Sequence, residues 1–166
     1  MRYILALATI LLTYIYFALF FSISLNYIYL PVSFVLAVYF LLGFNKATLV
    51  ALISSFMTDI HYYYIGQYML PLMLALIVSH LIYNYMISGQ TIKSEIVLYF
   101  FALLFFNLGL IVSSSLEIGS TYYNVFDAYI FIRLISSTII LTLITFIIRV
   151  IIKFILSFNG FQKKSF

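Results

Sequence analysis

Cysteine and tryptophan are both absent from this chain of 166 residues, and charged residues make up only 7% of it. Without cysteine the chain can form no disulfide, no thiolate metal site and no cysteine nucleophile. With so few charged side chains it also lacks the polar surface that a water-soluble globule of this size needs. The composition therefore indicates that the protein is solvated by lipid.

Long apolar runs dominate what is present, with 66% hydrophobic residues and a mean hydropathy of +1.22. Inside a bilayer a chain can satisfy its backbone hydrogen bonds only as helices or as a closed barrel. The apolar runs here are continuous and lack the two-residue alternation of barrel strands. We therefore expect an all-α, polytopic membrane helical bundle.

Glycine and polar residues divide the apolar sequence into six expected transmembrane segments, at about 2–25, 30–43, 45–60, 68–87, 95–115 and 127–152. The first is longer than the apolar core of a signal peptide and has no A-x-A site, which favours a retained signal anchor. The second and third are short for a crossing of about 30 Å, and form either two short crossings or a re-entrant hairpin. Residues 1–156 thus make one membrane domain, followed by a short basic tail at 157–166.

Basic residues predict the orientation of this bundle. In the six-segment arrangement the opposite loops at 26–29, 59–67 and 116–127 contain no Lys or Arg, and one side carries Arg2, Lys46, Lys93, Arg149, Lys153, Lys163 and Lys164. Because basic loops stay in the cytoplasm, we expect both termini there. The basic residues are scattered inside the chain, so no nucleic-acid partner is expected.

Three of the four carboxylates fall on the outer side in this topology. They are Asp59, Glu117 and Asp127, and His61 lies beside the first of them. Together with the tyrosines that follow His61, these residues either form a solvated rim at the membrane interface or make a specific contact.

Arg133 lies six residues into the last expected segment, about 9 Å below Asp127 at a rise of 1.5 Å per residue. A charge at that depth is compensated by snorkelling toward the interface, by a ligand, or by an anion on another helix. Asp127 lies on a different face of the same helix, so Asp59 is the better protein partner. Our hypothesis is an Asp59–Arg133 contact that fixes the relative position of two helices.

The other polar residues of the apolar segments are expected to hydrogen-bond between helices; they are Ser54, Ser55, Ser79, His80, Asn84, Asn107 and the run from Ser136 to Thr138. A metal site would need more converging ligands than Asp59, His61 and His80 provide. A Ser-His-Asp triad would need a nucleophile elbow, which neither Ser54 nor Ser55 has. We therefore expect no metal, no cofactor and no enzymatic activity.

Two stretches resemble the rod shape-determining protein MreD family. Residues 51–82, ALISSFMTDIHYYYIGQYMLPLMLALIVSHLI, read as an apolar helix ending in Asp, a short outer loop with Gly, and a second apolar helix. Residues 126–156, FDAYIFIRLISSTIILTLITFIIRVIIKFIL, read as a last helix with an Arg near its outer start and basic residues at its inner end. The resemblance is specific at Asp59, Gly66 and Arg133.

By this resemblance the protein would be a non-enzymatic scaffold in the bacterial cytoplasmic membrane that helps to organise cell-wall elongation and cell shape. The implied partners are membrane lipid, MreC, MreB, RodA and penicillin-binding protein 2.

The alternative is the substrate-binding S component of an energy-coupling-factor vitamin transporter, a family of similar fold, which would bind a small molecule. Such a component is expected to carry pairs of small residues four apart on its first helix. This chain has only one such pair, Ala18 and Ser22, which disfavours the alternative. An assembly factor with another partner is a third, less specific reading.

Single cysteines can test this topology, because the chain has none of its own. The outer positions Gly66→Cys and Tyr122→Cys should react with a membrane-impermeant thiol reagent in intact cells, and the inner position Gln90→Cys should not. Labelling of Gln90→Cys, with no labelling at either outer position, would contradict the six-crossing topology.

Overall fold

The computed structural model describes residues 2–20, 29–62, 66–86, 92–117 and 128–158. This part of the chain forms six α-helices and no strand. The helices are α1 (Arg2–Phe20), α2 (Leu30–Leu42), α3 (Phe44–Tyr62), α4 (Met69–Met86), α5 (Ile92–Glu117) and α6 (Ala128–Phe158). The prediction of an all-α protein with six helices is confirmed.

Local sequence explains where several helices begin and end. Pro31 lies in the first turn of α2, where a missing N–H costs no intrahelical hydrogen bond. Gly43 ends α2 with a φ of 90°, and Gly66 precedes α4 with a φ of 97°, a region that favours glycine. Helix α5 begins at Ile92, three residues before the approximate start that was predicted, and α6 continues to Phe158, six residues beyond the predicted end.

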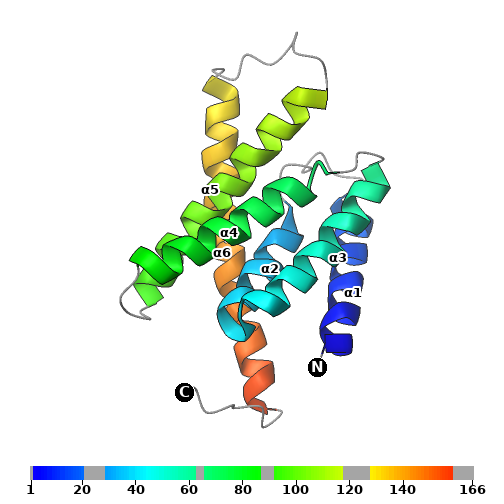
Figure 1. Cartoon of the computed structure of the whole chain (residues 1–166), viewed down its shortest axis with the longest axis vertical. Helices are drawn as coiled ribbons and strands as arrows, with labels where there is room; N and C mark the ends of the chain where they lie inside the picture. Colours follow the sequence, from blue (N-terminus) through cyan, green and yellow to red (C-terminus); the bar gives the residue numbers. More distant parts are fainter. Residues whose placement is uncertain (1, 21–28, 63–65, 87–91, 118–127, 159–166) are drawn as a thin grey trace.

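Successive helices alternate in direction, so the start of α1 and the end of α6 lie toward the same side of the molecule (Figure 1). The turn between α2 and α3 lies toward this side too (Figure 1). Lys46 in the first turn of α3 and Lys153 near the end of α6 therefore share it. On the opposite side, the end of α5 and the start of α6 project beyond the other helices (Figure 1).

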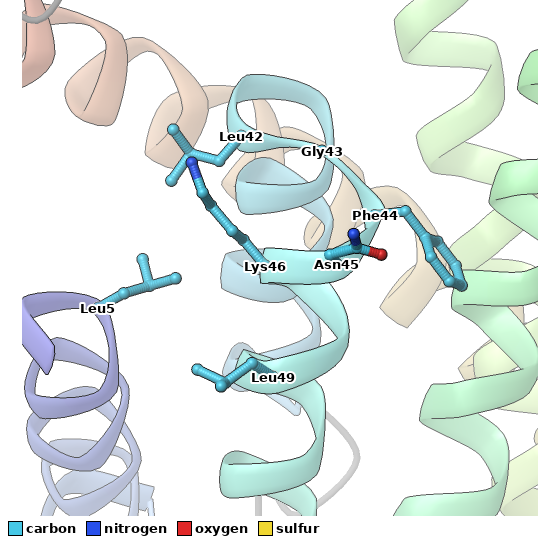
Figure 2. A pocket seen from close by; sticks show the side chains of 7 residues that line it. All are labelled: Leu5, Leu42, Gly43, Phe44, Asn45, Lys46 and Leu49. Carbon is cyan, nitrogen blue, oxygen red and sulfur yellow. The ribbon is translucent and has the colours of Figure 1, made fainter. Parts of the chain in front are cut away.

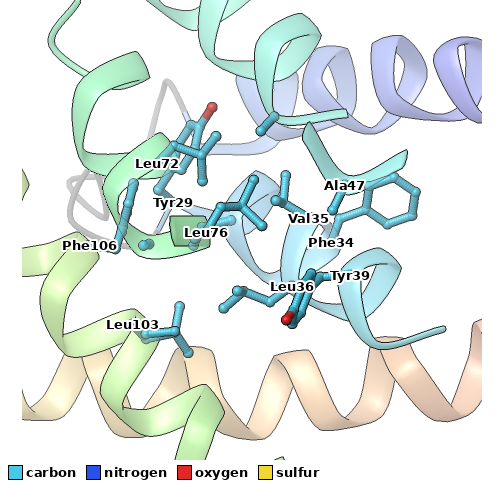
Figure 3. Packing of buried hydrophobic residues seen from close by; sticks show 14 of the residues in the cluster. Tyr29, Phe34, Val35, Leu36, Tyr39, Ala47, Leu72, Leu76, Leu103 and Phe106 are labelled. Atoms are coloured by element: carbon cyan, nitrogen blue, oxygen red, sulfur yellow. The ribbon is translucent and has the colours of Figure 1, made fainter. Parts of the chain in front are cut away.

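Helix α2 occupies the centre of the bundle. Its residues 31–39 are all buried, and it packs against α1, α3, α4 and α6. The apolar core is built on it, with side chains from α4 and α5 closing over one flank (Figure 3). Labelled members of this core include Tyr29, Val35, Leu36, Leu72, Leu76, Leu103 and Phe106.

Helices α4 and α5 pack closely where Gly109 faces Pro71. A Cβ atom added at Gly109 would lie 2.9 Å from the Cβ of Pro71, well inside the normal separation of about 3.5–4.0 Å between carbon atoms. The absence of a side chain at Gly109 therefore sets how closely the two helices approach.

Replacing Gly109 by Ala should lower the free energy of unfolding by about 1–3 kcal/mol, the usual cost of overpacking. The measurement is denaturant unfolding of the purified protein in detergent. Leu108→Ala is the control on the same helix, because Leu108 is exposed and its truncation leaves no cavity. A Gly109→Ala variant as stable as the parent would show that α4 and α5 can separate at this point without cost.

Candidate functional site

The first polar site is built around Asp59, in the last turn of α3. The residue is only 1% exposed. Its Oδ2 accepts a hydrogen bond of 2.8 Å from the backbone N–H of Gly66, and its Oδ1 accepts one of 2.8 Å from the N–H of Tyr68. The carboxylate therefore joins the end of α3 to the residues that precede α4, with two charge-assisted hydrogen bonds.

Tyr29, immediately before α2, connects this site to other helices. Its hydroxyl shares a 2.8 Å hydrogen bond with Oγ1 of Thr58 on α3. Its ring centroid lies 4.8 Å from that of Tyr68 and 5.5 Å from that of Phe106 on α5. Tyr16 of α1 meets the same ring edge to face at 5.5 Å. Aromatic rings from three other segments thus converge on Tyr29 beside the buried carboxylate.

The structure gives Asp59 different partners from the one predicted. Both of its oxygens accept backbone hydrogen bonds, and the residue is buried, whereas Arg133 is exposed on α6. The reason is that the N–H groups before α4 are close in sequence and need acceptors, so the carboxylate satisfies them first. This corrects the hypothesis of an Asp59–Arg133 contact.

The remaining predicted site residues are dispersed. His61 is exposed, with its ring centroid 4.2 Å from that of Phe17. Glu117 is the last residue of α5, and Arg133 lies in the second turn of α6, so both belong to the projecting ends of these helices (Figure 1). Asp127 lies outside the described residues. Among the described candidates, the structure brings together Asp59 and Gly66.

A second polar site, which sequence reasoning missed, joins α5 to α6. Nη2 of Arg149 lies 2.7 Å from Oε1 and 2.6 Å from Oε2 of Glu95. The two side chains are 15% and 13% exposed, so the ion pair is largely buried. Tyr99, one turn after Glu95 and fully buried, lies within electrostatic range of both charges. The sequence analysis used Arg149 as a sign of orientation and as a basic residue at the inner end of the last helix. The signal that it overlooked was one acid and one base near the adjoining ends of two consecutive antiparallel helices.

A third polar site ties α4 to the turn between α2 and α3. The hydroxyl of Tyr39 lies 3.2 Å from Nδ1 of His80, and Nδ2 of Asn84 lies 3.0 Å from its Nε2. The ring of Phe44, at the start of α3, lies 4.5 Å from the imidazole ring. Both ring nitrogens of His80 are thus engaged by protein, as expected for an interior histidine.

The prediction of hydrogen bonds between helices holds for part of the polar set. Nδ2 of Asn107 donates to Oγ1 of Thr138 at 2.9 Å, which links α5 to α6. Several buried hydroxyls instead donate to a carbonyl of their own helix; they are Ser54, Ser55 and Ser79. Ser55 and Ser79 correct the prediction, because their hydroxyls are satisfied within their own helices.

A shallow cleft of about 530 Å³ opens beside the turn between α2 and α3, next to the start of α1 (Figure 2). It is lined by Leu5, Leu42, Gly43, Phe44, Asn45, Lys46 and Leu49. The polar side chains of this lining are the amide of Asn45 and the ammonium group of Lys46, and the lining contains no carboxylate. In the described part of the chain, no three His, Asp or Glu side chains come together to hold a metal ion.

No protein-family model matches the chain, and neither a curated protein nor a solved structure matches it significantly.

Asp59→Asn should lower the free energy of unfolding by about 1.5–3 kcal/mol, the usual contribution of hydrogen bonds to a charged group. The Asn side chain would also place its own NH₂ donor against one of the two backbone N–H donors, so that one hydrogen bond would be lost. Thermal and denaturant unfolding in detergent measure the loss. The double variant Asp59→Asn/Arg133→Gln should lose the sum of the two single losses, because the two residues are not in contact. A coupling above about 0.5 kcal/mol would show that the two charges interact.

Proposed function

We propose that the protein is an integral membrane scaffold that acts through contact and not through catalysis. The observation that carries this proposal is the distribution of polarity. Buried positions between the helices hold many hydroxyl side chains, among them Thr9, Thr13, Ser54, Thr58, Thr138, Thr142 and Thr145. Large apolar side chains lie on the outside, among them Leu7, Leu81, Phe101, Ile132, Leu143, Ile147 and Phe154. A water-soluble protein hides such side chains, whereas a membrane bundle presents them to lipid and packs small residues inside.

Helix length supports the same proposal. Within the described residues, Ile92–Ser113 and Phe131–Ile155 are long and apolar enough to cross a membrane. In an 18-residue window of each stretch, only 33% and 22% is buried, whereas the core helix of a soluble protein would be mostly buried. The short helix α2 is covered by other helices, so on this proposal it need not match the thickness of the bilayer.

The proposed orientation follows the basic residues. The side that carries Lys46, Lys93 and Lys153 would face the cytoplasm, and the projecting ends of α5 and α6 would face outward. The helices then alternate in direction within the membrane, with both termini inside and with α2 and α3 as two short crossings or a re-entrant hairpin.

The resemblance to the MreD family supports a scaffold role in the cell-wall elongation machinery of a bacterial cytoplasmic membrane. On this proposal the projecting ends of α5 and α6, which include Glu117 and Arg133, meet the outer part of MreC. MreB is reached through MreC or through the inner loops, and RodA and penicillin-binding protein 2 lie in the same membrane. The Asp59 hydrogen bonds keep the end of α3 and the start of α4 in a fixed relation, so that the outer surface is presented in one form.

Affinity purification of the tagged protein from native membranes, followed by mass spectrometry, tests this function. The proposal expects cell-wall elongation proteins to co-purify after the membranes have been washed at alkaline pH, which removes peripheral proteins. Arg133→Gln should lower their recovery, because it changes the projecting end, and Leu81→Ala on the exposed face of α4 is the matched control.

Recovery of an ATPase pair with a coupling subunit would instead indicate the vitamin-transporter component. Release of the protein itself by the alkaline wash would contradict the membrane proposal, and neither partner set appearing would contradict both partner assignments.

A further inference from the structure

The Glu95–Arg149 site has more hydrogen-bonding capacity than the described protein groups around it satisfy. Nε of Arg149, Oε2 of Glu95 and the hydroxyl of Tyr99 are all buried, and none has a hydrogen-bond partner among the described residues. Oε2 does touch the guanidinium at 2.6 Å, but without a well-directed hydrogen bond. One donor (Nε), one acceptor (Oε2) and one hydroxyl that can both donate and accept are therefore left without a described partner at this site.

Such groups are costly to bury unsatisfied. The large majority of buried side-chain polar atoms in proteins have a partner, and an ion pair stabilises a buried position only when its remaining donors and acceptors are also satisfied. Helix α2 contributes the ring of Phe40, whose centroid lies 4.8 Å from that of Tyr99. An aromatic ring in this position cannot satisfy the three groups.

The chemistry of the three groups defines what can satisfy them. The opposite charges of Glu95 and Arg149 balance, so the site favours neither an anion nor a cation. Its occupant must donate to Oε2 and accept from Nε, and it must be small, because Tyr99 is fully buried. Water meets these requirements, and buried waters typically make about three hydrogen bonds to protein groups.

We propose that Glu95, Tyr99 and Arg149 form a water-binding site between α5 and α6, in which bound water links the Tyr99 hydroxyl to the ion pair. The site lies toward the side on which α6 ends, which is the side that carries the basic residues (Figure 1). It is separate from Asp59, whose two oxygens are satisfied by the backbone. The inference goes beyond the proposed scaffold role and does not depend on the identity of the partner.

Two tyrosines provide a matched comparison that tests this proposal. Tyr29 and Tyr99 are both 0% exposed, but the Tyr29 hydroxyl has a protein partner, Thr58, at 2.8 Å. If water satisfies the Tyr99 hydroxyl, Tyr99→Phe should lower the melting temperature by a few degrees, and Tyr29→Phe, which loses the hydrogen bond to Thr58, should lower it by a similar amount. If the hydroxyl has no partner, its removal relieves an unsatisfied group, and the melting temperature should stay the same or rise. The second result would overturn the proposal.

A second variant tests the link to the ion pair. Arg149→Lys keeps the charge but removes the Nε donor, so the loss caused by Tyr99→Phe should shrink by at least half in that background. An undiminished loss would show that the hydroxyl is not linked to the pair.

Radiolytic hydroxyl-radical footprinting of the unmodified protein tests hydration directly, because radicals form from bound water and label adjacent side chains. Tyr99 should be labelled faster than Tyr29, although both are equally buried. Equal or slower labelling of Tyr99 would overturn the proposal.

Discussion

The burial of residues 31–39, the greater part of α2, is the constraint on which the rest of the structure depends. The helix has 13 residues, which at 1.5 Å per residue makes it about 20 Å long. In the proposed bilayer such a helix could not reach both interfaces, and its unsatisfied terminal backbone groups would lie in hydrocarbon. The other helices solve this problem by burying residues 31–39. α2 therefore contributes side chains to every neighbour it contacts, and in the proposed membrane the longer helices α5 and α6 would supply much of the surface that faces lipid.

The two charged sites stabilise this arrangement in different ways. Asp59 binds backbone N–H groups and so fixes a connection between consecutive helices, α3 and α4. Glu95 binds Arg149 and so fixes how α5 crosses α6. A carboxylate that accepts local backbone donors needs no distant partner, whereas a buried ion pair is sensitive to the loss of either member. The site that sequence reasoning selected is thus locally satisfied, and the one that it missed holds two helices together.

The sequence predicts the helices well because their determinants are local. Continuous apolar runs, Pro31 in a first turn and Gly43 at a helix end act within a few residues, so six helices can be placed without knowledge of packing. The Asp59–Arg133 hypothesis failed because matching depth along two helices does not say which faces point toward each other. The hydrogen bond from Gly66 to Asp59 depends on the path of the intervening loop. Glu95 and Arg149 meet through the packing of α5 against α6, which no periodicity in the sequence encodes.

The pattern of hydrogen bonds also distinguishes the helices by how firmly they are held. Most buried Ser and Thr hydroxyls bond to their own helix, as Thr142 does to Thr138, so they allow close packing without directing it. Directional bonds between helices instead join α5 to α6 twice, through Asn107 on one turn and Glu95 three turns earlier. Helix α1 packs on α3 and α2 at the edge of the bundle, and its Thr9 and Thr13 donate within the helix. These two side-chain contacts therefore fix how α5 packs against α6 at two levels along the pair.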